Sequence, residues 1–168
     1  MEIIKEVKGL FQIIALKKFR ATEGVAFDII PNELLENLSG IDRVIHGPDA
    51  FSPGTVGECD RPWYMHTHQN DNLIVLSGER HVDIYSKKHG KVEQFVVTPN
   101  RILQNGKLIT DEPSMLVWKE NVFHRVFSPD GSASLNLATR VNGYDNDTNF
   151  SIYDVNTDTG EYEVARAG

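Results

Sequence analysis

From residue 60 onward, the sequence consists of short apolar segments separated by turn residues. The segments recur about every ten positions, a spacing typical of antiparallel β-sandwiches and barrels. Segments 73–76, 81–85 and 92–97 follow one another in this way, and they predict a three-stranded meander. Further strands are expected at 115–118, 123–127 and 133–138. The chain is therefore predicted to be mostly β, with eight or more strands.

Two hairpins are predicted from local sequence. Asn105-Gly106 lies between apolar pairs, and this dipeptide favours a two-residue turn because both positions tolerate positive φ. Segments 150–155 and 162–165 flank a turn sequence and are expected to pair.

The N-terminal part of the chain carries weaker signals. Residues 32–38 follow Pro31 and end before Gly40, which predicts a short helix. Apolar residues between 3 and 16 fit both helical and strand spacing, so this segment stays open, with a strand favoured after Phe11.

Length and composition limit the possible functions. A chain of 168 residues is expected to form one compact domain, and 40% hydrophobic with 24% charged residues is ordinary for a globular protein. The net charge of -7 argues against nucleic-acid and membrane partners, whose phosphates attract Lys and Arg. One cysteine, Cys59, and no export signal predict a cytoplasmic location.

A histidine pair carries the strongest chemical signal. His66 and His68 are separated by one residue, so on a regular strand both imidazoles project from the same face. Asp71 follows them, and a third histidine, His124, enters from a later predicted strand. Such a set could hold one divalent metal ion, whereas an isolated pair would more often be solvated or hydrogen-bonded.

This pattern resembles the cupin family, whose first motif is histidine, any residue, histidine, three or four residues, glutamate, six residues, glycine. His66, His68 and Gly78 match it if Asp71 stands for the glutamate. The second motif contributes one histidine, and 113–126 fits its outline, although Lys119 and Ser128 replace the usual proline and asparagine.

The resemblance implies a single-domain cupin β-barrel, also called a double-stranded β-helix and similar to a jelly roll. We expect residues 60–140 to form the barrel core. Residues 1–59 would add strands and a short helix packed on the barrel, and 141–168 a C-terminal hairpin. All three parts would belong to one domain, and pairing of cupins through barrel edges leads us to expect a homodimer.

The fourth ligand is left open between Asp71, Asn72 and water. Asn72 would restore the loop length of the motif, but Asp71 keeps the six-residue spacing to Gly78. A one-residue slip turns a strand side chain to the other face, whereas loops tolerate shortening, so Asp71 is favoured.

Three functions are compatible with this site. The first is a metal-dependent isomerase or epimerase of a sugar or keto acid, and the second is a ferrous-iron dioxygenase. The third is a binding module without catalysis, since fold does not determine function. A small molecule is the expected substrate or ligand, and zinc, iron, manganese or nickel the expected metal. A barrel whose histidines only form hydrogen bonds, as in some sugar-nucleotide epimerases, is the metal-free alternative.

Few other residues suggest a role in the site. Tyr64 shares the face of His66 on an extended strand, where it could orient a ligand or act as the catalytic acid, although core packing is the favoured role for such a residue. Arg80, His81 and Asp83 follow Gly78, and we expect them to make cross-strand or rim contacts.

Overall fold

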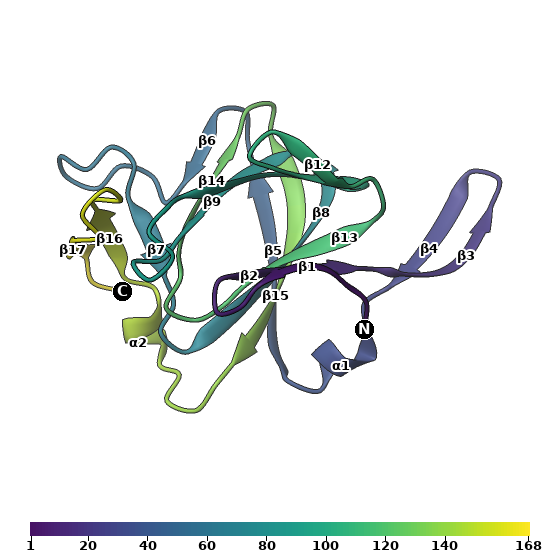
Figure 1. Cartoon of the computed structure of the whole chain (residues 1–168), viewed down its shortest axis with the longest axis horizontal. Coiled ribbons are helices and arrows are strands. Elements are labelled where there is room, and N and C mark those ends of the chain that lie inside the picture. The colour runs from purple at the N-terminus through teal and green to yellow at the C-terminus, as the bar shows by residue number, and fades with distance from the viewer.

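The computed structural model describes residues 1–168, apart from the side chain of Leu35, and it consists almost entirely of antiparallel strands. Two large sheets face each other around a barrel-like interior (Figure 1). The prediction of a mostly β chain is confirmed. Neither helix of the described chain has the length and apolar character needed to cross a membrane.

The first sheet has six strands in an order far from their order in the chain. They are, from edge to edge, β1 (Ile3–Val7), β2 (Phe11–Ala15), β13 (Ser114–Trp118), β8 (Gln69–Gly78), β15 (Ser132–Arg140) and β5 (Leu38–His46).

The second sheet has nine strands. In order they are β12 (Lys107–Thr110), β11 (Arg101–Gln104), β10 (Glu93–Thr98), β9 (Arg80–Tyr85), β14 (Phe123–Ser128), β7 (Trp63–Met65), β16 (Ile152–Val155) and β17 (Tyr162–Arg166), while β6 (Ala50–Ser52) pairs with β14.

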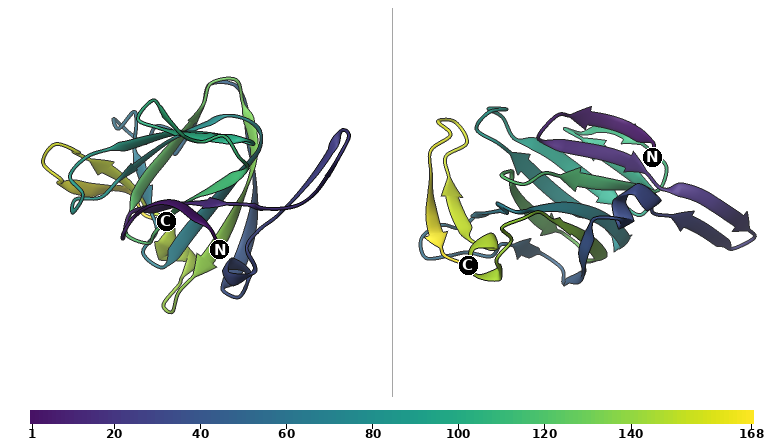
Figure 2. Two further views of the ribbon diagram at one scale, coloured as in Figure 1. Left: turned by 45° about the vertical axis from the view of Figure 1, so that its right-hand side comes forward. Right: turned by 90° about the horizontal axis from the view of Figure 1, so that it is seen from below.

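Three smaller elements complete the chain. The strands β3 (Lys17–Thr22) and β4 (Val25–Ile29) form a separate hairpin that projects from the body as an arm, visible in both views of Figure 2. The helices α1 (Asn32–Leu35) and α2 (Asn146–Asn149) are one turn each.

The main core lies between the two sheets. Its members alternate along each strand with side chains that point outward, as strand geometry requires. They include Phe11, Leu73, Val82, Ile84, Phe95 and Leu116, all at most 2% exposed.

The two ends of the chain cover the outer faces of the sheets. Leu16, Ile30, Leu34 and Leu38 pack over the outer side of β13 and β15, and the C-terminal strand β16 places Tyr153 against Trp63 and Phe123. Both additions bury apolar surface that would otherwise face water.

The structure confirms some predicted elements and corrects others. Asn105 and Gly106 both have positive φ and join β11 to β12, and β16 pairs with β17, so both hairpins are confirmed. The predicted helix at 32–38 is shorter in the structure and ends at Leu35, because β5 already begins at Leu38. The N-cap residue of the helix, Pro31, forms no side-chain hydrogen bond that would stabilise its first turn.

The predicted three-stranded meander is wrong in its first connection. β9 pairs with β10, but β8 pairs with β13 and β15 and belongs to the other sheet. The chain changes sheets at Gly78, where φ is +71° and a side chain would collide with the backbone carbonyl of Gly131. Glycine is therefore required at this corner.

Candidate active site

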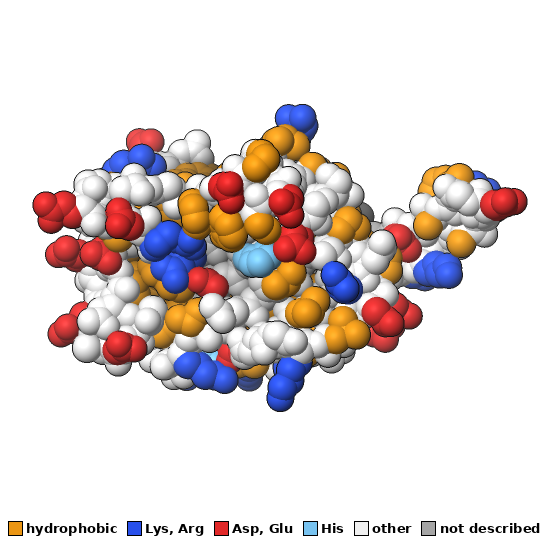
Figure 3. Space-filling model, turned by 90° about the horizontal axis from the view of Figure 1, so that it is seen from above, with side chains coloured by type: hydrophobic (Ala, Val, Ile, Leu, Met, Phe, Trp, Pro, Cys, Tyr) orange, Lys and Arg blue, Asp and Glu red, His pale blue; other side chains and the backbone are white. Residues whose placement is uncertain are grey.

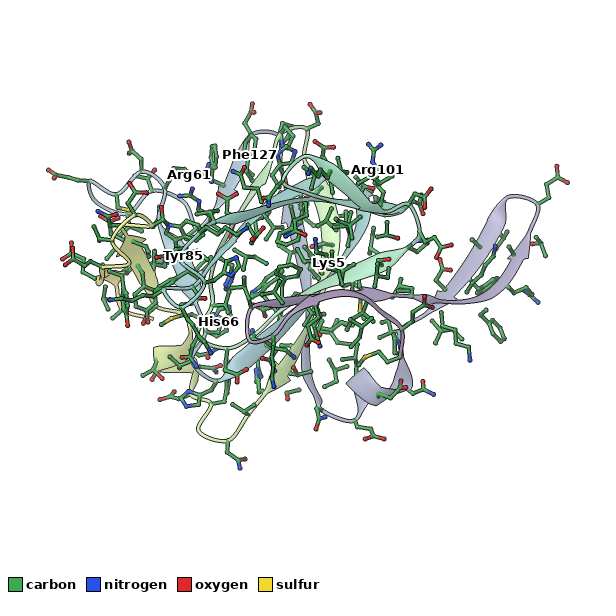
Figure 4. The ribbon with its side chains drawn as sticks, in the orientation of Figure 1. Lys5, Arg61, His66, Tyr85, Arg101 and Phe127 are labelled. Carbon is green, nitrogen blue, oxygen red and sulfur yellow. The ribbon has the colours of Figure 1, made fainter. Side chains whose placement is uncertain are left out.

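A pocket opens between the two sheets of the barrel, with a volume of about 340 Å³. Its wall is formed by inward-facing side chains of both sheets, among them Tyr64, His66, Asp71, Arg80, Trp118, His124 and Ser134. His66 is labelled at the lower left of the barrel in Figure 4. A larger hollow of about 770 Å³ lies beside Met1 and Glu33, but none of its described lining residues is a histidine. Volume alone therefore does not identify the site.

Three of the four predicted metal ligands meet in this pocket. The ligand atoms of His66, Asp71 and His124 lie within 4.8 Å of one another, and all three residues are buried. Oδ2 of Asp71 is 3.3 Å from Nε2 of His66 and 3.7 Å from Nε2 of His124.

His68 does not join this group. The chain leaves strand geometry at residues 66–68, so the alternation that would place His66 and His68 on one face is lost. The half-buried His68 ring instead lies against Gly143 and has Nδ1 2.9 Å from the Thr67 hydroxyl. Gln69, the first residue of β8, takes the inward position beside Asp71.

The structure places Asp71, rather than Asn72, in the cluster. Asn72 is buried on the other face of β8, where its side-chain amide donates a hydrogen bond to the carbonyl of Leu137. Oδ1 of Asp71 accepts hydrogen bonds from Gln69 Nε2 and Asn136 Nδ2, both 2.8 Å long. These two amides fix the carboxylate and leave Oδ2 facing the imidazoles.

Backbone carbonyls determine which nitrogen of each imidazole carries hydrogen. Nδ1 of His66 lies 2.6 Å from the carbonyl of Asn149, and Nδ1 of His124 lies 3.3 Å from that of Val122. A carbonyl oxygen can only accept, so each Nδ1 is the donor. In the neutral rings, both Nε2 lone pairs then point toward the carboxylate of Asp71, and the cluster requires a cation, either a proton or a metal ion.

The pKa shifts show where a proton is held. Burial disfavours the charged form of His66, but the hydrogen bond and charge of Asp71 outweigh it and raise the pKa above the usual 6.5. Burial and the neighbouring charge of His66 lower the pKa of His124 to about 4. Burial alone would raise the pKa of Asp71, yet the two histidines hold it well below its usual range.

Tyr64 lies beside both imidazoles, as its position two residues before His66 predicts. Its ring centre is 6.2 Å from that of His66 and 5.9 Å from that of His124. The phenol lines the pocket and is half-buried, so it can reach a bound ligand.

Two buried polar groups in the wall have no partner among the described residues. The indole Nε1 of Trp118 and the hydroxyl of Ser134 are buried and form no hydrogen bond with another described residue. Trp118 is 5% exposed and Ser134 is 1% exposed, and both line the pocket. Buried polar groups are normally paired, so these two are suited to bind polar atoms of a ligand.

Arg80 lies in the pocket, which the sequence did not predict. Arg80 was expected to make a cross-strand or rim contact, but it lines the pocket and is 4% exposed. Its position two residues before Val82 and four before Ile84, which are both core residues, is the signal that could have placed it inside.

The fold of this chain is similar to that of solved structures, although its sequence matches no known family. No protein-family model matches the chain, and no curated protein matches its sequence. Solved structures do match. The sugar 3,4-ketoisomerase QdtA from Thermoanaerobacterium thermosaccharolyticum, crystallised with TDP, aligns with a TM-score of 0.56 at 15% identity, covering 83% of this chain and 85% of that one. The fold is that of the cupins.

Two further cupins show the same likeness. The TDP-quinovose 3,4-ketoisomerase WlaRB from Campylobacter jejuni has a TM-score of 0.57 and 17% identity, with 83% and 90% of the two chains covered. The 4-keto-6-deoxy sugar epimerase NovW from Streptomyces spheroides has a TM-score of 0.59 and 12% identity, with 87% and 70% covered. The predicted cupin barrel is thereby confirmed.

Proposed function

We propose that this chain is an isomerase or epimerase that moves a proton on a carbon atom beside the carbonyl group of a keto sugar. The observation that carries the proposal is the buried pair of His66 and Asp71 in the wall of an open pocket. The solved cupins with similar folds include sugar 3,4-ketoisomerases and a keto sugar epimerase, which supports the same class of substrate.

His66 has the features of a general base. In its neutral form, Nδ1–H is held by the carbonyl of Asn149, and the lone pair of Nε2 lies 3.3 Å from Oδ2 of Asp71 in the pocket wall. Against the effect of burial, the carboxylate raises the pKa of His66 and so strengthens it as a base. When Nε2 takes a proton from the substrate carbon, the electron pair moves to the carbonyl oxygen and gives an enediolate. Asp71 stabilises the imidazolium that forms. Delivery of the proton to the former carbonyl carbon, with loss of the proton from the adjacent hydroxyl, completes an isomerisation, whereas protonation of the original carbon from its opposite face inverts it.

Tyr64 is the proposed acid for the substrate oxygen. Its phenol lies in the same pocket as His66, and a hydroxyl can donate to the oxygen on which negative charge develops. The two groups together provide one acceptor and one donor for the proton transfers.

A few polar groups in a largely apolar wall suit the hydroxyl groups of a sugar. The unpartnered groups of Trp118 and Ser134 can bind hydroxyl oxygens, and the side chains of Gln69 and Asn136 also line the pocket.

A metal-dependent reaction is the second candidate, because the donor set also fits a metal ion. Two imidazole nitrogens and one carboxylate oxygen suit iron, manganese, nickel or zinc. With bonds of about 2.1 Å, neighbouring ligand atoms would be roughly 3 Å apart, which the separations of 3.3 and 3.7 Å approach. His66, Asp71 and His124 would hold the ion, which would polarise a substrate oxygen or, as iron, serve oxygen chemistry.

Replacing His66 is expected to abolish proton exchange. With TDP-4-keto-6-deoxyglucose and related keto sugars in D₂O, we expect the wild type to introduce deuterium beside the carbonyl, as followed by NMR. His66→Gln should lower the rate by roughly 10²- to 10⁴-fold through loss of the base. His68→Gln, which changes a histidine outside the cluster, is the matched control and should retain the rate. A wild type that exchanges no proton on any keto sugar would contradict the proposal.

Metal analysis separates the two candidates. Wild type, His124→Ala and His68→Ala are purified without added metal, then reloaded with zinc, iron, manganese or nickel and analysed for bound metal. The metal-dependent candidate predicts about one ion per chain in the wild type and in His68→Ala, and none in His124→Ala. Absence of metal from all three after reloading would eliminate that candidate and leave acid–base catalysis by His66.

We further propose that the protein is a homodimer joined through the β3–β4 arm. Every residue of both strands is exposed, including Phe19 at 67% and Phe27 at 44%, and an isolated two-stranded hairpin is only marginally stable in water. Figure 3 shows hydrophobic side chains on the arm, which stands apart from the body.

Light scattering after size-exclusion chromatography tests this assembly. We expect a dimer for the wild type and a monomer for the double variant Phe19→Ser/Phe27→Ser, because the variant removes apolar surface available to the partner. The double variant Lys5→Ser/Lys8→Ser, changed outside the arm, should remain dimeric. A monomeric wild type at micromolar concentration would refute the assembly.

A further inference from the structure

Arg80 is a buried cation without a counter-charge. It lies on the inward face of β9 and is 4% exposed. None of the ion pairs among the described side chains includes it. Arg125, on the neighbouring strand β14, differs in this respect, because its Nε donates to Asp83 at 2.8 Å.

The partners of Arg80 are all neutral. Nε donates to the hydroxyl of Ser132 at 3.1 Å, and Nη2 donates to the carbonyl of Val44 at 3.2 Å. Behind them, the Ser132 hydroxyl lies 2.8 Å from that of Ser128, which lies 3.0 Å from Nδ1 of His46. Burial and the charge of Arg80 lower the pKa of His46 to about 4, so this ring adds no negative charge and is itself uncharged at neutral pH.

Arg80 keeps its charge in this setting. Burial lowers its pKa only to about 10, well above neutral pH. A buried charge is costly unless a group of opposite charge or several hydrogen bonds offset it. Asp42 and Asp71 line the same pocket, but neither lies within ion-pair distance of Arg80, so a bound anion would complete the site.

The pocket joins Arg80 to the proton-transfer cluster. Along β15, Ser132 contacts Arg80, Ser134 has its free hydroxyl, and Asn136 binds Asp71, so three inward positions connect the two ends. Ser132 and Asn136 are four residues apart, which corresponds to roughly 13 Å along a strand. The cation and the base therefore lie at opposite ends of one pocket.

We propose that Arg80 binds a carboxylate or phosphate group at the end of the substrate remote from the carbon on which His66 acts. The substrate is then a sugar acid or a sugar phosphate, with Ser134 binding a hydroxyl between the two ends. A short keto acid does not fit, because its carboxylate adjoins its carbonyl. This inference rests on the proposed function for the role of His66, whereas anion binding by Arg80 can be measured without catalysis.

Calorimetric binding tests the proposal with three probes: galacturonate, glucose 6-phosphate and neutral glucose. We expect the wild type to bind at least one acidic sugar tenfold or more tightly than glucose, and the tighter of the two identifies the anionic group. Arg80→Met should bind the acidic sugars no better than glucose. Arg101→Met removes an equal charge far from His66 (Figure 4) and should bind like the wild type.

Two further measurements distinguish the possible failures. His66→Gln should still bind the acidic sugar within a few-fold, so a protein that binds anions but exchanges no proton would overturn only the proposed function. Without ligand, Arg80→Met should melt at the same or a higher temperature, because it removes an uncompensated buried charge. A lower melting temperature together with unchanged binding of acidic sugars would show that Arg80 is only structural. Equal binding of acidic and neutral sugars by the wild type would also overturn the inference.

Discussion

The site depends on one interaction, the approach of two imidazole nitrogens to a single carboxylate oxygen inside a barrel. Asp71 is 2% exposed, and its other oxygen is fixed by Gln69 and Asn136, so it cannot turn away from His66 and His124. Backbone carbonyls orient both rings with Nε2 toward it. Negative charge held in this way inside a protein requires a cation, and the candidate chemistry follows from which cation is present.

The barrel makes this arrangement possible because it places polar side chains at inward positions that would otherwise belong to the core. On β14, His124 shares its face with Val126, and on β9, Arg80 shares its face with Val82. Polar side chains at buried positions destabilise a fold unless each polar group has a hydrogen-bond partner. Asp71 and the two histidines satisfy one another, whereas Trp118 and Ser134 have no partner, and Arg80 has only neutral ones.

Strand alternation explains which parts of the site could be predicted from the sequence. The choice of Asp71 over Asn72 followed from parity within a regular strand, and β8 is regular from Gln69 to Val75, before its register with β15 shifts. The same argument failed for His68, because the chain turns between β7 and β8 and parity does not extend across a turn. The change of sheet at Gly78 was likewise not visible, since a glycine after an apolar run fits a simple hairpin equally well.

The protonation states of the two buried histidines test the central claim most directly. In protein labelled with ¹⁵N and treated with a chelator, imidazole nitrogen shifts at pH 6 report the protons on each ring. We predict that His66 carries protons on both nitrogens, while His124 is neutral with its proton on Nδ1. A neutral His66, or a charged His124, would contradict a cluster organised around the His66–Asp71 pair.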